Sequence, residues 1–430
     1  MKLTRRITAV GLYLSLCHRN RYQAQGGENV RSRGSVASVT AWRRAACLLL
    51  LAGGLPVAGA LAQVPVDVRP APSGFDLNVG LGMRLTSNAG LEPGAGSEGD
   101  SIADLRADLT GHRGSPRTDW SARYTPFYTR YGNNGQFDTV NHALMVDARY
   151  ALTQRSKLTL SDRFYASRDL SHIDGADTTG DPVILTQLTR RWRNFADAGF
   201  DANLSRDLSL QVGASSRIER FDLSPSVNSN MDAARLGLRK QVGREDGFST
   251  TYTYSRFGFE NRGVDGAEAH GMDLAWTHGV PSRTDWVLSA GVSTVSRGSD
   301  RQNQFTAAAS LHHPFRRLDF VSGYRRGLGA DAGVANVTVT QDLNAGLSGK
   351  AGQRTRLAVR GEYGTRDSIL DGGDRLRLAY AGGSLLGTVT VNQRLSISGE
   401  ARRRKQTVTE GTGDQLTVNM FLLRLNILVF

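Results

Sequence analysis

The stretch Leu77-Asn78-Val79-Gly80-Leu81-Gly82-Met83-Arg84-Leu85-Thr86 alternates between an apolar residue and a polar residue or glycine. Successive side chains of a β-strand point to opposite faces, so this stretch predicts a strand with one apolar and one polar face. The same alternation recurs along the rest of the chain, for example at 104–110, 140–150, 208–215, 286–292 and 395–397. The repeated pattern predicts an all-β protein built from amphipathic strands.

A soluble β-sandwich also alternates, so strand length and connections must separate it from a membrane barrel. The predicted strands span about 10–16 residues, where soluble strands average about 5–6 and membrane-barrel strands need about 9–11. Short connections, such as 153–156 and 281–284, alternate with longer polar stretches, such as 87–100 and 168–182. Short turns on one side and long loops on the other are typical of outer-membrane barrels.

Counting these segments predicts an antiparallel transmembrane β-barrel of about 18 strands, with 16 as the alternative. A closed barrel is required because lipid offers no partner for the unpaired backbone groups of an open edge. An even number of strands places both chain ends on the same side of the membrane. The predicted strands are 75–87, 101–111, 118–131, 138–152, 157–167, 183–204, 208–221, 232–243, 248–260, 268–279, 285–297, 304–313, 317–326, 334–348, 354–365, 375–391, 395–407 and 415–430.

The residues before the barrel contain a secretory signal. Arg43 and Arg44 precede an apolar run at 45–62, which ends in the small-x-small cleavage motif of Ala60 and Ala62. A transmembrane anchor is the alternative, but the run contains three glycines and a proline and is short for a bilayer core. We therefore expect four parts, namely an upstream extension at 1–41 that a start codon placed too early would explain, a signal peptide at 42–62, a periplasmic tail at 63–74 and an outer-membrane barrel at 75–430.

The net charge of +13, from 53 Lys and Arg against 40 Asp and Glu, at first suggests a nucleic-acid partner. Residues 1–62 hold nine basic residues and one acidic residue, a net charge of +8, which leaves +5 for the predicted mature chain. Both cysteines also lie in this leader. The remaining basic residues are spread over strands rather than gathered in a patch, so no nucleic-acid partner is predicted.

If the apolar faces meet lipid, the polar faces line the lumen, and arginine is prominent on them. A guanidinium offers a planar fork of donors suited to carboxylate and phosphate, so the pattern predicts a lumen that favours anionic solutes. The alternative is a ladder of opposite charges that only stiffens the wall, because Asp76, Asp104, Asp108, Asp147, Glu219, Glu362 and Glu400 are predicted on the same face. The lumen-facing candidates are Arg84, Arg106, Arg123, Arg149, Arg217, Arg235, Arg239, Arg356, Arg360, Arg375, Arg377, Arg402 and Arg404.

The last residues, 423–430, resemble the final strand of outer-membrane barrels, whose terminal aromatic residue is read by the barrel-assembly machinery. That resemblance implies an assembly signal at Phe430. The register departs from the usual signature, because steps of two residues back from Phe430 meet Asn426 and Arg424, where apolar residues are preferred. The alternative is that Phe430 simply ends an apolar strand.

Residues 120–131, Asp138, His142 and 152–162 carry a more specific likeness. The order Tyr-x-Pro-x-Tyr, a His-containing strand and a turn into a Leu-rich strand resembles outer-membrane β-barrel porins associated with exopolysaccharide loci, the β-barrel porin 2-like group. The resemblance implies a barrel in the cell outer membrane of a Gram-negative bacterium. Because some members lie beside polysaccharide-export systems, it also implies such a role here.

Together these features predict a porin-like channel, or an accessory to exopolysaccharide export, that is exported through a cleaved signal peptide and passes anionic solutes. The expected partners are outer-membrane lipid, lipopolysaccharide, the barrel-assembly machinery and polysaccharide-export components. No enzyme activity, cofactor or metal is predicted. His172 lies in an acidic loop, and the adjacent His312 and His313 would point to different faces of a strand. The alternatives are a barrel lipase or protease, and a structural barrel without an open pore.

Overall fold

The computed structural model describes residues 74–88, 99–168, 190–222, 227–260, 265–279, 284–330, 336–370, 377–408 and 415–429. The predicted upstream extension, the signal peptide and residues 63–73 of the tail lie outside this part of the chain. Arg375, His172 and Phe430 also lie outside the described residues, so the predictions made for them stay predictions.

The described residues form 18 β-strands and one short 3-10 helix, Gly135–Phe137. No helix among them is long and apolar enough to cross a membrane. The strands are β1 Gly74–Thr86, β2 Asp100–Gly114, β3 Thr118–Tyr131, β4 Thr139–Ala151, β5 Ser156–Ser167, β6 Arg191–Asn203, β7 Leu208–Phe221, β8 Asn228–Val242, β9 Asp246–Glu260, β10 Ala267–Gly279, β11 Asp285–Arg297, β12 Asp300–Pro314, β13 Leu318–Ala330, β14 Val337–Lys350, β15 Thr355–Ser368, β16 Arg377–Thr390, β17 Leu395–Val408 and β18 Gln415–Leu428.

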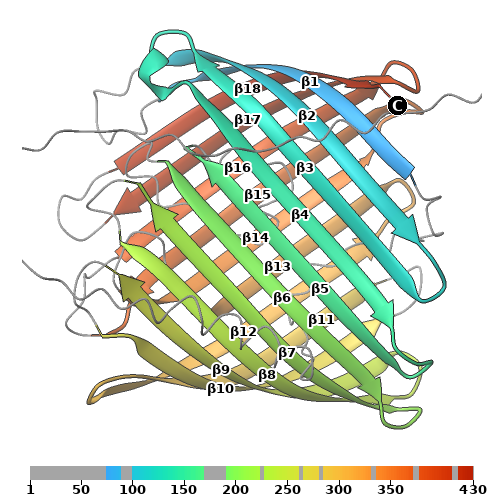
Figure 1. The fold of residues 1–430 in the computed structure, drawn as a ribbon, viewed down its shortest axis with the longest axis vertical. Helices are drawn as coiled ribbons and strands as arrows, with labels where there is room; N and C mark the ends of the chain where they lie inside the picture. The colour runs from blue at the N-terminus through green and yellow to red at the C-terminus, as the bar shows by residue number, and fades with distance from the viewer. Residues whose placement is uncertain are drawn as a thin grey trace, which may run out of the picture. The chain divides into compact units, whose positions relative to one another are not determined.

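The sheet closes on itself. Each strand pairs antiparallel with its neighbour in sequence, and β1 also pairs antiparallel with β18. In that closing pair Asn78 lies opposite Leu428 and Thr86 lies opposite Met420. Figure 1 shows the tilted strands of the resulting barrel. The predicted all-β antiparallel barrel is therefore confirmed, with 18 strands rather than 16.

The connections differ in length at the two ends of the barrel. We call the end that holds connections such as 115–117, 204–207 and 391–394 the short-turn end, and the opposite end the long-loop end. In the turn at 204–207, the Ser205 hydroxyl donates to the Asp207 carboxylate at 2.7 Å. This bond holds the pKa of the exposed Asp207 carboxyl below its ordinary value. Polar side chains of this kind stabilise tight turns locally.

One predicted long loop is a tight turn. The sequence pattern predicts a polar loop at 297–303, but β11 ends at Arg297 and β12 begins at Asp300, which lies opposite it. Gly298 has a φ of 56°, a left-handed conformation that glycine adopts without steric cost. The polar residues 300–303 are therefore part of β12, where they pair with residues 294–297 of β11.

The two faces of the wall differ in character. Leu81 and Leu105 lie opposite each other on the outer face and are 52% and 50% exposed. Most buried apolar residues of the strands instead face the lumen, as in the cluster of Ile102, Tyr131 and Leu416 from β2, β3 and β18. A lipid-facing surface needs no protein cover, so the packed core of this barrel lies inside it.

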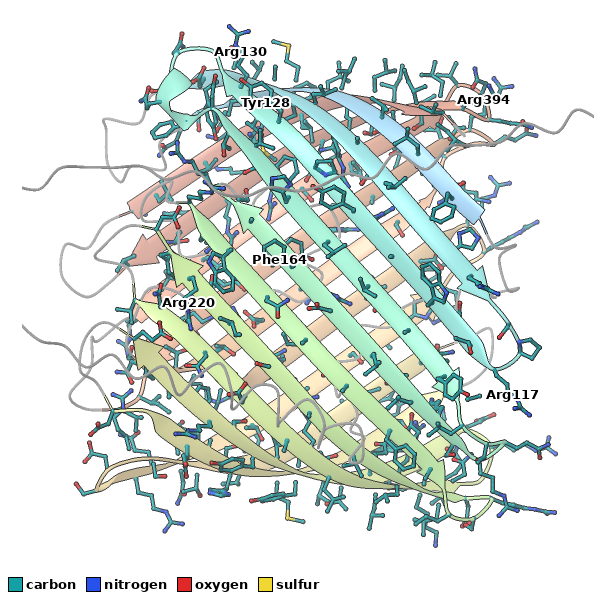
Figure 2. The ribbon with its side chains drawn as sticks, in the orientation of Figure 1. Arg117, Tyr128, Arg130, Phe164, Arg220 and Arg394 are labelled. Carbon is teal, nitrogen blue, oxygen red and sulfur yellow. The ribbon has the colours of Figure 1, made fainter. Side chains whose placement is uncertain are left out.

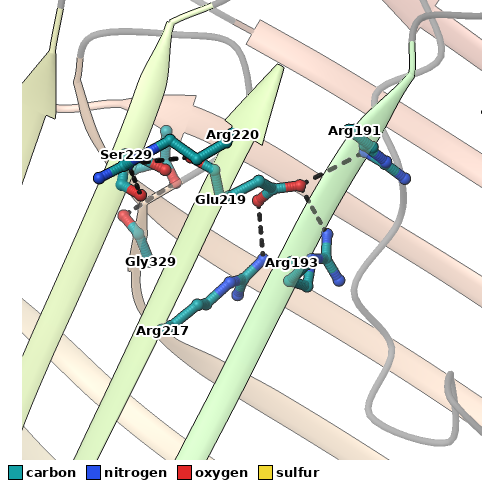
Figure 3. A network of polar contacts seen from close by, with 8 residues as sticks. Arg191, Arg193, Arg217, Glu219, Arg220, Ser229 and Gly329 are labelled. Carbon is teal, nitrogen blue, oxygen red and sulfur yellow. Dashed lines mark hydrogen bonds and ion pairs between the residues drawn. The ribbon is translucent and has the colours of Figure 1, made fainter. Parts of the chain in front are cut away.

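The ends of β13 and β14 also contact strands that are not their neighbours in the sheet. Val337 and Ala330 are buried in one apolar cluster with Phe257 and Val295, which lie on β9 and β11. β13 contacts β8, although four strands separate them in the sheet. Figure 3 shows Gly329 of β13 beside the β8 residue Ser229. This apolar contact narrows the lumen near the long-loop end.

Candidate functional site: the charged lumen wall

The strand register places most predicted arginines on one continuous face. Gly80 of β1 faces Arg106, and the same alternation runs through every neighbouring strand to β18, where Arg424 faces Gly82. This face carries the buried apolar clusters and is the lumen face. The predicted residues on it are Arg84, Arg106, Arg123, Arg149, Arg217, Arg235, Arg239, Arg356, Arg360, Arg402 and Arg404.

The prediction that Arg377 faces the lumen was wrong, because Arg377 lies on the outer face. It pairs with Asp367 on β15 at 3.1 Å, and its side chain is 68% exposed. On β16 the neighbouring Leu378 and Tyr380 face the lumen and are buried, with exposures of 0% and 3%. The prediction assumed that apolar residues meet lipid, whereas on this part of β16 the apolar residues Leu378 and Tyr380 face the lumen, so alternation places Arg377 on the outer face.

A buried carboxylate gathers three of the lumen arginines (Figure 3). Glu219 Oε1 lies 3.4 Å from Arg191 Nη1 and 3.1 Å from Arg193 Nη2, and Glu219 Oε2 lies 3.6 Å from Arg217 Nη2. The Glu219 side chain is 1% exposed. One negative charge thus holds three positive charges together on β6 and β7, and the group retains a net charge of +2.

A second network lies on β14 to β17. Asp342 Oδ1 accepts hydrogen bonds from Arg366 Nη1 at 2.7 Å and from the Tyr380 hydroxyl at 2.6 Å. The Arg404 guanidinium carbon lies 4.9 Å from the centre of the Tyr380 ring, within cation–π range. Arg404 also lies near Glu362, at 3.8 Å. Aromatic, acidic and basic side chains therefore form one connected layer inside the wall.

Other predicted residues fall into two groups. Arg106 pairs with Asp108 at 2.8 Å, and Arg402 pairs with Glu362 at 3.3 Å, as the charge-ladder alternative expects. In contrast, a set of lumen arginines makes no ion pair with any carboxylate that the structure describes. This set consists of Arg123, Arg149, Arg239, Arg356 and Arg360.

Sequence reasoning missed several charged residues of the lumen face. Arg191 and Arg193 lie in the predicted strand 183–204, which is much longer than the observed β6, and Arg366 lies one residue beyond the predicted strand end at 365. Continued alternation from Arg356 through Arg360 would have found Arg366. The missed basic residues are Lys157, Arg163, Arg191, Arg193, Arg297, Arg325, Lys350, Arg366 and Arg424, and the missed acidic residues are Asp100, Asp119, Asp197, Asp201, Asp273, Asp285, Asp300, Asp319 and Asp342.

The described histidines are divided between the two faces. His142 lies on the outer face, where its Nδ1 is 2.8 Å from the Tyr124 hydroxyl. His312 faces the lumen and is buried, whereas the adjacent His313 faces outward and contacts the Thr284 hydroxyl at 2.7 Å. Within the described residues, no group of three or more His, Cys, Asp and Glu residues is arranged to hold a metal ion.

No family model and no curated protein matches the chain. Solved structures with a similar fold include the outer-membrane protein OpdK of Pseudomonas aeruginosa, with 8% identity, 83% of this chain and 99% of that chain covered, and a TM-score of 0.44. OccK2 (OpdF) of the same organism, in complex with glucuronate, has 11% identity, coverages of 83% and 98%, and a TM-score of 0.43. OccAB4 of Acinetobacter baumannii has 9% identity, coverages of 83% and 99%, and a TM-score of 0.43. The fold assignment itself rests on the strand pairings, which close an 18-stranded barrel with a charged inner face.

Proposed function

We propose that this protein is an outer-membrane channel that passes anionic solutes. The main observation in favour of this proposal is the net positive charge of the lumen face. The predicted and missed residues described above place 20 basic and 16 acidic side chains on this face among the described residues, a net charge of +4. A lining with excess positive charge raises the local concentration of anions and lowers that of cations.

The apolar exposure of the outer face supports the membrane location. Residues such as Leu274 and Met272 on β10 are 63% and 58% exposed, which would be unfavourable in water over so large a surface. A closed antiparallel barrel with an apolar outer face fits an outer membrane. Lipid and lipopolysaccharide are its proposed surroundings, and the barrel-assembly machinery its proposed assembly partner.

The narrower proposal is that the solute is an acidic polysaccharide segment and that the barrel serves exopolysaccharide export, together with export components. Two observations support it, namely the resemblance at residues 120–162 and the unpaired arginines of the lumen. The arginines at Glu219 and Asp342 support wall rigidity first, because each already binds a carboxylate of the wall, although the Glu219 group keeps a net charge of +2.

Planar-bilayer recording of the refolded chain tests the channel proposal. We expect discrete conductance steps and a reversal potential, under a KCl gradient, that shows preference for chloride. Replacing Arg123, Arg149 and Arg360 with Gln should shift the reversal potential towards cations. The matched control replaces Arg377, Arg403 and Lys405, which face outward, and should leave it unchanged. A barrel that folds but never conducts would refute the channel and favour a structural role.

A further inference from the structure

The inner wall of the barrel contains a recess at the short-turn end, and basic residues are concentrated in it. It has a volume of about 560 Å³ and is bounded by the turns at 115–117 and 152–155 and by the adjoining ends of β3 to β8. This size is within the range of about 300–1,000 Å³ that is usual for sites of small ligands. Its basic residues are Arg117, Arg149, Arg155, Lys157 and Arg239.

The acidic residues of this recess do not neutralise the arginines. Asp201 is already occupied, because it pairs with Lys157 at 2.9 Å and accepts a hydrogen bond from Gln211 at 3.3 Å. Asp119 lies opposite Arg149 in the β3–β4 register but forms no ion pair with it. Five basic and two acidic side chains leave the recess with a net charge of +3.

Four guanidiniums in this recess therefore lack a partner among the described carboxylates. Arg239 lies between Ser209 and Ser249 in the register, so its direct neighbours on the adjacent strands carry hydroxyl groups and no carboxylate. Arg117 and Arg155 lie in neighbouring short turns, where no side-chain bond to a described residue holds their guanidiniums. This differs from the networks at Glu219 and Asp342, where each carboxylate has bound arginine already.

Like charges placed together with too few counter-charges repel one another, and this repulsion is relieved when a ligand supplies further anionic groups. A guanidinium can bind a carboxylate through two parallel hydrogen bonds. We propose that this recess is a binding site for solutes that carry two or more carboxylates, of the acidic-oligosaccharide class, at the short-turn mouth of the channel. The site deepens the proposed function and rests on it for its physiological role, but the binding itself does not require an open pore.

The position of the recess indicates at which step of transport a solute would bind to it. Figure 2 shows Arg117 and Arg394 at the same end of the barrel, opposite the end that holds Arg130. In outer-membrane barrels the short turns face the periplasm. A multivalent anion that approaches from that side meets the recess before it meets the narrowed region near the long-loop end. Several carboxylates bound at once would favour an oligomer over its monomer through effective concentration.

Isothermal titration calorimetry on the full chain in detergent tests the site, with digalacturonate, galacturonate and neutral maltose as probes. We expect digalacturonate to bind at least tenfold more tightly than galacturonate, and maltose not to bind. The double variant R149Q/R239Q should weaken digalacturonate binding by at least tenfold. The control R354Q/R394Q removes two charges from the same mouth but outside the recess, and should change the affinity by less than twofold.

The two variants are expected to fold alike, because none of the four arginines forms an ion pair within the described residues. Heat-modifiable migration on gels checks this. Equal weakening in both double variants, or no preference for the dicarboxylate, would overturn the proposed site. Binding that follows this pattern in a barrel without conductance would support the site and refute the channel. Anion-selective conductance without digalacturonate binding would support the channel and refute the binding site.

Discussion

The buried carboxylate of Glu219 makes a sharp prediction about stability. The change is Glu219→Gln, which keeps the shape of the side chain and removes its charge. At 3.1 Å and an effective dielectric constant of about 20, the pair with Arg193 alone has a gross Coulomb energy of roughly 5 kcal/mol. The cost of desolvating the charges and the repulsion among the three arginines offset much of this Coulomb energy. Removing one partner of a buried pair typically costs about 3–5 kcal/mol, because the other charge stays buried.

We therefore expect Glu219→Gln to lower the free energy of unfolding by about 3–5 kcal/mol. The assay is equilibrium urea unfolding of the refolded barrel in lipid vesicles, followed by tryptophan fluorescence. The matched control is Glu400→Gln, which removes the same charge from the same face on β17 without breaking an ion pair within the described residues. Its expected cost is below about 1 kcal/mol.

A second variant separates lost attraction from remaining repulsion. Replacing Arg193 with Met in the Glu219→Gln background removes one of the stranded cations, so part of the lost stability should return. Equal losses for Glu219→Gln and Glu400→Gln, with no recovery in the double variant, would refute the claim that Glu219 holds the arginine group together.

Further predictions concern the narrowed lumen, one turn and the outer face. Val337→Asp places a charge in the apolar cluster that joins β14 to β9 and β11, so single-channel conductance should rise relative to Val337→Ala, and equal conductances would argue against the narrowing. Gly298→Ala forces a side chain into a φ of 56° and should cost about 1–2 kcal/mol in urea unfolding, whereas Ser299→Ala should cost almost nothing. Leu81→Arg on the outer face should cost about 2–4 kcal/mol in vesicles, and Asn78→Arg on the lumen face of β1 far less; similar costs would contradict the assigned faces.

The strands themselves could be predicted from the sequence. Alternation at 77–86 and its repeats requires only neighbouring residues, because each side chain points opposite to the one before it. The need to pair every backbone group in lipid then implies closure. The predicted strand boundaries were less accurate where a strand begins with a run of polar residues. At 300–303, for example, β12 already pairs with β11 directly after a two-residue turn.

Assignment of a face required more than alternation. At β16 the apolar residues Leu378 and Tyr380 point inward, so the prediction for Arg377 was wrong. Period two separates the faces of a strand but does not say which face is lipid-exposed. Only the pairing of β16 with β15 and β17 decides that, because neighbouring residues in register share a face.

By itself the sequence determined the fold class and predicted about 18 strands, with 16 left open, and an arginine-rich lumen, because each follows from local periodicity and composition. The tertiary structure alone decided which charges are compensated. Glu219 meets Arg193 only through the register of β6 and β7, and Asp342 meets Tyr380 across two strand pairings. Arg117, Arg149 and Arg239 lie far apart in sequence, and they share one recess because the successive pairing of β3 to β8 brings their ends together at the short-turn end. Coulomb interactions depend on distances in space, so the sequence shows how many charges there are but not which of them remain available to a ligand.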